Sequence, residues 1–256
     1  MRGVRKPWPP QKIDRDGNDP RRLVDAEKEY LVALSNKEAH KRSAFARGQF
    51  DDLRKRELRE VLYREQGALC VYCERDLVER HPEPRIDHWR PLSLNPELAL
   101  HWENLYLACP ADDTCDGRKG NRPLKWDKGD PDLPWPTELA YEDIVGFTSL
   151  GEIFVRADAV IDDATRKALQ LAIEDQLDGG RVRKAILDLN HPAIVAARAA
   201  ALDSERKRLE KDYENETASG PDREKRADAL LERSRRPAFV SIRAAWLRKA
   251  LGKGRE

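Results

Sequence analysis

Residues 70–92 read CVYCERDLVERHPEPRIDHWRPL and combine a pair of cysteines with an acid beside a histidine. Cys70 and Cys73 are separated by two residues, which is the spacing of a zinc knuckle. A second pair, Cys109 and Cys115, has five residues between its members, which is a less usual spacing. The four cysteines predict one structural Zn²⁺ ion, held tetrahedrally with no open position for water. The alternative is that they are unrelated buried thiols.

The composition of the chain places few limits on its function. Its 256 residues are 37% charged and 39% hydrophobic, as in many globular proteins. The 48 Lys and Arg residues nearly balance the 47 Asp and Glu residues, so a nucleic-acid partner has to be argued from local clustering. No apolar run approaches the roughly 18 residues of a membrane span, and no signal-peptide pattern is present. We therefore expect a cytoplasmic protein without a membrane partner, whose cysteines stay reduced.

Apolar periodicity predicts an α-rich α+β protein in three parts. Residues 1–66 are expected to form an extended arm over 1–20 and two helices over 21–66, the second ended by Gly67. Residues 67–135 are expected to form a compact metal-organised module. Residues 136–256 begin with a predicted hairpin over 144–155. Helices are predicted in the remainder of this third part, at 163–177, 180–187, 192–216, 222–235 and 239–251.

Several side chains close to the cysteines suit the hydrolysis of a phosphodiester bond. Asp87 and His88 are adjacent, Asn104 precedes the third cysteine, and Asp116 follows the fourth. Such hydrolysis needs a deprotonated water and a cation that neutralises charge on the phosphoryl and leaving oxygens. Imidazole suits the proton transfer because its usual pKa of about 6.5 lies near neutral pH. The alternative for His88 is a histidine that only packs within the zinc module.

The order and spacing of these elements resemble the HNH endonuclease family, in its ββα-metal form with an embedded four-cysteine zinc. The resemblance rests on four motifs: Cys-x2-Cys, Asp-His-x2-Pro, Asn-Leu before a Cys, and Cys-Asp-x2-Lys. It implies a ββα-metal HNH module with structural zinc, embedded between helical flanking regions. It also implies an endonuclease that depends on a divalent metal ion.

The resemblance implies a role for each matched residue. His88 matches the general base that takes a proton from the attacking water, and Asn104 matches the asparagine that braces the loop and holds the base strand in place. Asp87 and Asp116 match the ligands of the catalytic cation. Asp116 departs from the family, which usually has Asn or His there. Because a carboxylate is a harder ligand than an amide, the site should favour Mg²⁺ or Mn²⁺.

Three basic residues lie close in sequence to these positions. Arg90, Arg118 and Lys119 are expected to contact neighbouring phosphates of a nucleic acid, because charged contacts of this kind dominate nucleic-acid affinity. For each of them, ordinary surface charge is the alternative.

A narrower resemblance is to the HNH subunits of Septu-type antiphage defence systems and related retron systems, the PtuB-like group. It rests on the segments MRGVRKPWPP, CVYCE, NLYLAC, CDGRKGN and ILDLNHPAIVAAR. It implies a nuclease subunit that acts with a PtuA-like ATPase, docked through the flanking helices, with DNA as the favoured nucleic acid. Two alternatives stay open: a non-catalytic four-cysteine zinc module that binds nucleic acid or protein, and an HNH-type RNase.

Overall fold

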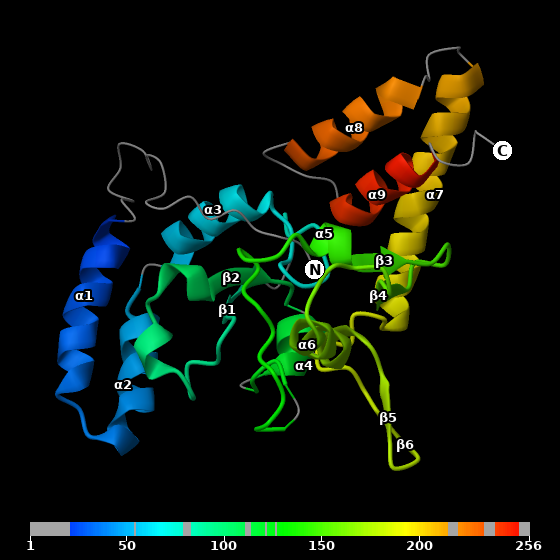
Figure 1. Ribbon diagram of the computed structural model, residues 1–256. Helices are drawn as coiled ribbons and strands as arrows, with labels where there is room; N and C mark the ends of the chain where they lie inside the picture. Colours follow the sequence, from blue (N-terminus) through cyan, green and yellow to red (C-terminus); the bar gives the residue numbers. More distant parts are fainter. Residues whose placement is uncertain are drawn as a thin grey trace.

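The computed structural model describes residues 21–53, 55–78, 83–110, 114–120, 122–125, 127–214, 220–232 and 239–250. The arm predicted over residues 1–20 lies outside these ranges. Within them the protein consists of helices and small two-stranded sheets, a mixed helix and strand architecture. Figure 1 shows helices α1 and α2 on one side, helices α7 to α9 on the other, and strands β1 and β2 between them. In the described part of the chain, no helix has the length and apolar character needed to cross a membrane.

The N-terminal region contains three helices, where the sequence predicted two. They are α1 (Arg21–Ser35), α2 (Ala39–Asp51) and α3 (Lys55–Gln66). The first break follows from side chains that compete for the helix backbone: Ser35 Oγ and Asn36 Nδ2 both donate to the carbonyl of Val32, at 2.7 and 3.1 Å. Helix α3 ends at Gln66, and the next residue, Gly67, has the left-handed φ of 64° expected of a glycine that ends a helix.

The central region joins the cysteines to a two-stranded sheet. Strand β1 (Arg85–His88) pairs antiparallel with β2 (Leu105–Ala108), and the short helix α4 (Cys115–Lys119) follows. Between the strands lie the 3-10 turns η1 (Pro96–Leu98) and η2 (Trp102–Asn104). Buried Gln66 ties α3 to this sheet, because its amide accepts from Leu107 N at 2.7 Å and donates to Leu69 O and Leu107 O. The end of α3 therefore fixes both the knuckle and β2.

The C-terminal region begins with the predicted hairpin. Helix α5 (Tyr141–Ile144) leads into β3 (Val145–Phe147), which pairs with β4 (Ile153–Val155). Later elements are α6 (Asp163–Ile173), β5 (Gln176–Asp178), β6 (Arg181–Arg183), α7 (Pro192–Glu214), α8 (Gly220–Glu232) and α9 (Val240–Ala250).

The helix predicted at 180–187 is wrong, and the helix predicted at 163–177 ends early, at Ile173. These residues form the β5–β6 hairpin instead, with Leu177 paired to Val182. Gly179 and Gly180 both have positive φ, of 54° and 79°, and two such residues make the tight turn whose twist suits a hairpin. The glycine pair lies where the sequence predicts a break between two helices, and in the structure it reverses the chain instead.

Hydrophobic packing joins the central region to both flanks. One buried cluster includes Leu62 of α3, Trp89 beside β1, Leu169 of α6 and Phe239 before α9. A second cluster packs α1 and α2 against the loop between the central strands, through side chains such as Tyr30, Phe50, Leu92 and Leu100. The cysteine-bearing region thus shares its core with helices from both ends, while the three-part division at residues 66 and 135 stays a prediction.

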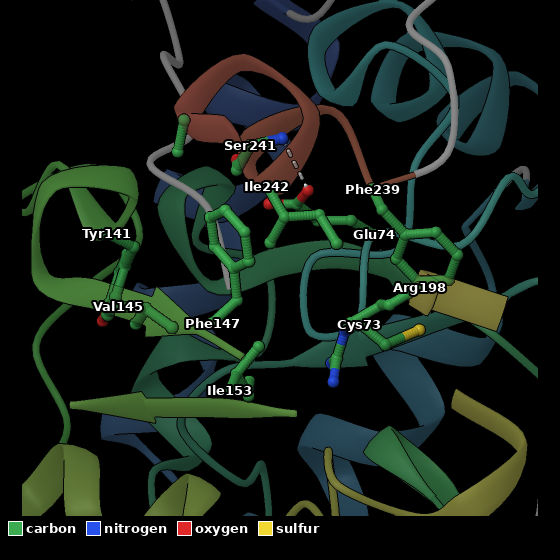
Figure 2. A pocket seen from close by; sticks show the side chains of 11 residues that line it. Cys73, Glu74, Tyr141, Val145, Phe147, Ile153, Arg198, Phe239, Ser241 and Ile242 are labelled. Atoms are coloured by element: carbon green, nitrogen blue, oxygen red, sulfur yellow. Dashed lines mark hydrogen bonds between the residues drawn. The ribbon is translucent and has the colours of Figure 1, made fainter. Parts of the chain in front are cut away.

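The last helix is attached directly to the cysteine knuckle. Glu74, which follows Cys73, is buried, and its carboxylate accepts from Ser241 N in the first turn of α9 at 3.0 Å. The carbonyl of Glu74 also accepts from Phe239 N at 2.9 Å. Figure 2 shows the hydrogen bond between Glu74 and Ser241. Both residues line a cavity of about 20 Å³, which Cys73 also lines. A carboxylate at a helix N-terminus is favourable, so this contact stabilises the seating of α9.

Candidate metal centre and active site

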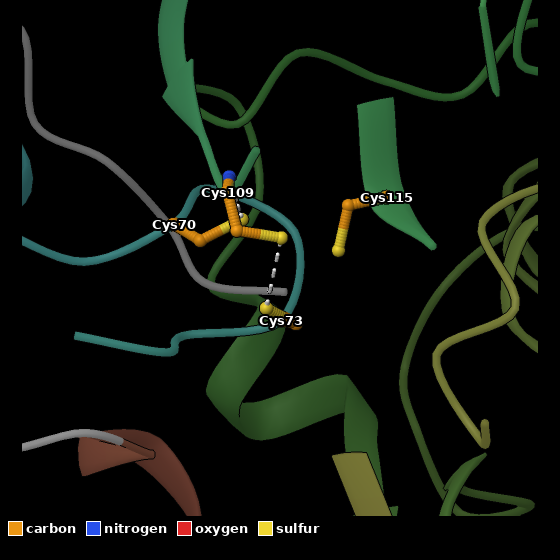
Figure 3. Close-up of side chains that lie close together, drawn as sticks. All are labelled: Cys70, Cys73, Cys109 and Cys115. Atoms are coloured by element: carbon orange, nitrogen blue, oxygen red, sulfur yellow. Dashed lines mark hydrogen bonds between the residues drawn. The ribbon is translucent and has the colours of Figure 1, made fainter. Parts of the chain in front are cut away.

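The four cysteines converge on one buried point. Their Sγ atoms all lie within 4.8 Å of one another, and all four side chains are free thiols that are almost completely buried. Figure 3 shows Cys70 and Cys73 on the knuckle, Cys109 beyond the end of β2, and Cys115 on α4, with the sulfurs pointing toward one another. Three separate elements thus supply one set of sulfur ligands.

The backbone around these cysteines is held in special conformations. Cys70 Sγ accepts from Cys109 N at 3.3 Å, and Cys115 N donates to Leu187 O at 3.0 Å. Glu74 and Cys115 have positive φ, of 60° and 54°, which residues other than glycine adopt only at a cost. Such strain is kept where the surrounding structure requires it, here directly after the Cys70–Cys73 knuckle and at the last cysteine.

The donor set fits a structural zinc ion. Zinc takes four thiolates at about 2.3 Å, and a tetrahedron of that size separates its sulfurs by about 3.8 Å. The Sγ atoms of Cys73 and Cys109 are 3.9 Å apart. Soft sulfur ligands in a closed, dry site favour zinc over Mg²⁺ or Ca²⁺. The residues present are therefore those that a structural zinc ion requires.

A second group of polar residues lies around a cleft of about 400 Å³. Asp87 and His88 of β1 and Asp116 of α4 all line it. Neighbours on a regular strand point to opposite faces, but β1 ends at His88, where the chain bends into the loop. The cleft therefore contains three of the residues that the sequence singled out for chemistry.

His88 is held in one tautomer. Its Nε2 atom lies 2.9 Å from the carbonyl oxygen of Ala99, which only accepts hydrogen bonds, so Nε2 carries the proton and Nδ1 is the basic nitrogen. The edge of the Phe50 ring packs against the imidazole, with ring centroids 4.4 Å apart. Burial is the main reason that the pKa of His88 is lowered to about 4, so the ring is neutral at pH 7.

Asp87 is bound by two donors inside the protein. Its Oδ2 atom accepts from the hydroxyl of Tyr72 at 2.5 Å and from the ammonium group of Lys119. Lys119 also donates to the carbonyl of His88 at 2.6 Å and to the Tyr72 oxygen at 3.1 Å. The Lys119 side chain is only 1% exposed, so it neutralises Asp87 within the core. A contact between Lys119 and phosphate, which the sequence analysis expected, stays a prediction; in the structure the ammonium group contacts these three groups of the protein.

Asp116 is a partly buried carboxyl group of the cleft with a shifted pKa. Burial raises its pKa to about 7, and the negative charge of Asp87 and a hydrogen bond with that carboxyl add to the effect, while Lys119 and Arg85 oppose it. Arg85 Nη1 is 3.7 Å from Asp116 Oδ2. Two carboxyl groups that face each other fit a divalent cation, whose charge and preference for oxygen ligands would stabilise both as carboxylates.

Asn104 is completely buried and connects the two sides of the loop between the strands. Its Oδ1 accepts from Arg90 N at 2.7 Å, and its Nδ2 donates to Arg90 O at 3.1 Å and to Leu98 O at 3.0 Å. Leu98 precedes Ala99, whose carbonyl holds His88. The Asn104 amide therefore fixes the segment that sets the orientation and tautomer of His88.

Asn104→Ala is expected to lower the free energy of unfolding by about 3 kcal/mol, because it leaves the backbone groups of Arg90 and Leu98 without their partner. It should also slow any cleavage, since the carbonyl of Ala99 would no longer be fixed. Urea unfolding and reaction rates measure the two effects. Asn95→Ala is the matched control, because Asn95 in the same loop donates one bond, to Pro91 O. Equal losses in both variants would contradict the bracing role.

The other predicted phosphate contacts lie away from the cleft. The guanidinium group of Arg90 lies over the ring of Trp135, 5.1 Å from its centroid, and 3.4 Å from Asp132. Arg118 is half-buried on α4. Among the described residues, neither of them lines the cleft, and nor does Lys119. A contact between Arg90 or Arg118 and nucleic acid stays a prediction.

The sequence analysis missed the cations that do line the cleft. They are Arg47 on α2, Lys55 and Arg59 on α3, and Arg85 on β1. The first three precede the motif residues by about 30 to 40 positions, and nothing in their local sequence distinguishes them from other charged residues on helix surfaces. Only the packing of α2 and α3 against the central strands and the loop between them brings these residues to the site.

Comparison with known proteins gives one partial similarity. No family model matches the chain. The Septu protein PtuB of Bacillus thuringiensis is 36% identical to it over 56 residues. The matched stretch is 22% of this chain and 21% of the length of that relative. Over about a fifth of its length, therefore, the chain is similar to PtuB.

Proposed function

We propose that the protein is a metal-dependent endonuclease of the HNH type that hydrolyses phosphodiester bonds, with DNA as the favoured substrate. The observation that carries the proposal is the arrangement of His88, Asp87 and Asp116 around one cleft. A neutral imidazole with a basic Nδ1, beside a pair of carboxyl groups, is the equipment for deprotonating water next to a bound cation.

In this proposal three side chains of the cleft take part in the reaction, and two buried side chains beside it hold them in place. His88 Nδ1 accepts the proton of the attacking water, while Nε2 keeps its bond to Ala99 O. Asp87 and Asp116 would hold Mg²⁺ or Mn²⁺, which stabilises negative charge on the phosphate and on the leaving oxygen. Lys119 holds Asp87 in place through Oδ2. Asn104 keeps the Ala99 segment in position.

We further propose that this nuclease acts in antiphage defence, as a subunit that works with a PtuA-like ATPase. The support is the resemblance of five short segments to the PtuB-like group and the partial similarity to PtuB. The flanking helices are the surfaces proposed to bind the ATPase. The expected outcome is that the full-length chain, co-expressed with a PtuA-like ATPase, elutes with it as one complex in size-exclusion chromatography. Separate elution of the two proteins would contradict this part of the proposal.

A second candidate function is a non-catalytic zinc module that binds nucleic acid or protein. One observation favours it: Asp87, a proposed metal ligand, already has its charge neutralised by Lys119. Under this alternative the Tyr72, Asp87 and Lys119 contacts are structural, and the cleft only binds. Cleavage is the property that separates the two functions.

Incubation of the purified protein with plasmid DNA and Mg²⁺ or Mn²⁺ is expected to produce cleavage that EDTA abolishes and that the His88→Ala protein lacks. A parallel reaction with RNA distinguishes a DNase from an RNase, because HNH chemistry can hydrolyse the phosphodiester bonds of DNA or of RNA. The assay is run with and without the co-expressed ATPase, since a subunit can be silent alone. Absence of cleavage in every arm, in protein that contains its zinc, would favour the non-catalytic module.

A further inference from the structure

The side of the cleft formed by α2 and α3 is strongly basic. Arg47, Lys55 and Arg59 come from these helices and Arg85 comes from β1, and all four line the same cleft as the candidate catalytic residues. The two carboxyl groups of the cleft are outnumbered by these four cations. The cleft therefore carries more positive charge than its own acids neutralise.

Two of the four cations are already engaged. Arg59 Nη1 lies 2.8 Å from Glu83 Oε2, and its Nε donates to Pro84 O at 3.1 Å. Arg85 lies 3.7 Å from Asp116. These contacts account for Arg59 and Arg85 within the folded chain.

Arg47 and Lys55 differ from these two in having no acidic partner. In the part of the chain that the structure describes, neither has a carboxylate within ion-pair distance. The ammonium group of Lys55 donates to the carbonyl of Phe50 and lies over the Phe50 ring, and neither contact neutralises its charge. Burial is the main reason that the pKa of Lys55 is lowered to about 8; Asp51 opposes the shift, and Arg47 and Arg59 add to it. Cations that crowd each other at a half-buried position favour the binding of an anion.

Helix α2 brings this charge next to the candidate base. Arg47 and Phe50 are three residues apart and so lie on the same face of the helix. Phe50 packs its ring against His88, with centroids 4.4 Å apart. Arg47 therefore lies on the face of α2 that packs against the candidate base.

We propose that Arg47 and Lys55 bind the backbone phosphates of the nucleic acid that flank the scissile bond. The proposal rests on the proposed nuclease function. It adds a phosphate-binding surface, formed by Arg47 and Lys55, that lies outside the motif region. A phosphodiester backbone carries one negative charge on each phosphate, which matches a row of cations beside the site where the bond is broken. Such contacts are independent of base sequence, so they would supply affinity and register without specificity.

The test measures the salt dependence of binding to a labelled DNA duplex and to an RNA of the same sequence, by fluorescence anisotropy. It uses the full-length His88→Ala protein, which is expected not to cut. Adding Arg47→Ala or Lys55→Ala should weaken duplex binding roughly tenfold at low salt and reduce the slope of log K against log salt by about 0.9 for each lost contact. Comparison of the DNA and RNA measurements shows which backbone this phosphate-binding surface prefers.

Arg42→Ala on α2 and Arg56→Ala on α3 are matched controls. Arg42 is exposed, with its Nε bonded to Lys37 O, and Arg56 is 88% exposed beside Glu60. Neither lines the cleft, so both variants should keep the affinity and the slope. Melting temperatures establish that all four variants are folded.

The outcomes separate this inference from the proposed function. If the wild-type protein cleaves nucleic acid but the Arg47 and Lys55 variants bind like the controls, the inference is wrong and the nuclease stands. If these variants lose affinity although the wild-type protein never cleaves, the phosphate-binding surface is supported and the proposed nuclease function is contradicted. If the wild-type protein binds neither DNA nor RNA, both fail.

Discussion

Cys70→Ser is expected to leave the protein without zinc and without a cooperative unfolding transition. Structural zinc in small modules contributes on the order of 10–16 kcal/mol of apparent binding free energy. The whole net stability of a domain is about 5–15 kcal/mol, so no other interaction of comparable size remains. The loss would also spread beyond the knuckle, because the cysteines belong to the same buried cluster as side chains of α6 and the segment leading to α9.

Elemental analysis of zinc and thermal unfolding followed by circular dichroism measure this effect. Val71→Ala is the matched control, because Val71 is buried beside Cys70 but offers no metal ligand. It should keep one zinc per chain and lose only about 0.5–3 kcal/mol, as ordinary core truncations do. A Cys70→Ser protein that melts like the control, or active wild-type protein without zinc, would overturn the structural metal site.

The structure also shows which parts of the fold are determined by local sequence signals. The hairpin β3–β4 and the long helix α7 were predicted near their observed bounds because each is marked by strong local signals, an apolar alternation or a helix-starting proline. The β5–β6 hairpin was missed because two adjacent glycines end a helix as readily as they turn a hairpin. Three-residue strands offer too few positions for a period of two to be recognised.

The candidate site was predictable to a similar extent. Motif spacing identified Asp87, His88 and Asp116, and these three line one cleft in the structure. The partners that determine their chemical state were not predictable. The Ala99 carbonyl that selects the tautomer of His88, and the Lys119 ammonium that neutralises Asp87, depend on loop and helix positions that only the packed core defines.

His88→Ala and Asp116→Ala are expected to abolish cleavage in different ways. His88 is proposed to transfer the proton, so His88→Ala should keep zinc and divalent-metal affinity while lowering the rate by about 10²–10⁴. High Mn²⁺ should not restore it, because the missing group is a base. Asp116 is proposed to hold the cation, so Asp116→Ala should weaken metal binding first, and more Mn²⁺ should recover part of the rate.

The measurement is the cleavage rate against Mn²⁺ concentration, with melting temperature as a control for folding. His101→Ala is the matched histidine control, because His101 in the same loop pairs with Glu27 at 2.8 Å and does not line the cleft. Asp116→Asn should be the mildest change, since an amide oxygen still ligates and the side chain keeps its size. Rescue of His88→Ala by metal would mean that His88 is not the base. An Asp116→Asn protein as inactive as Asp116→Ala would mean that the charge of Asp116, and not its oxygen ligand, is what the site requires.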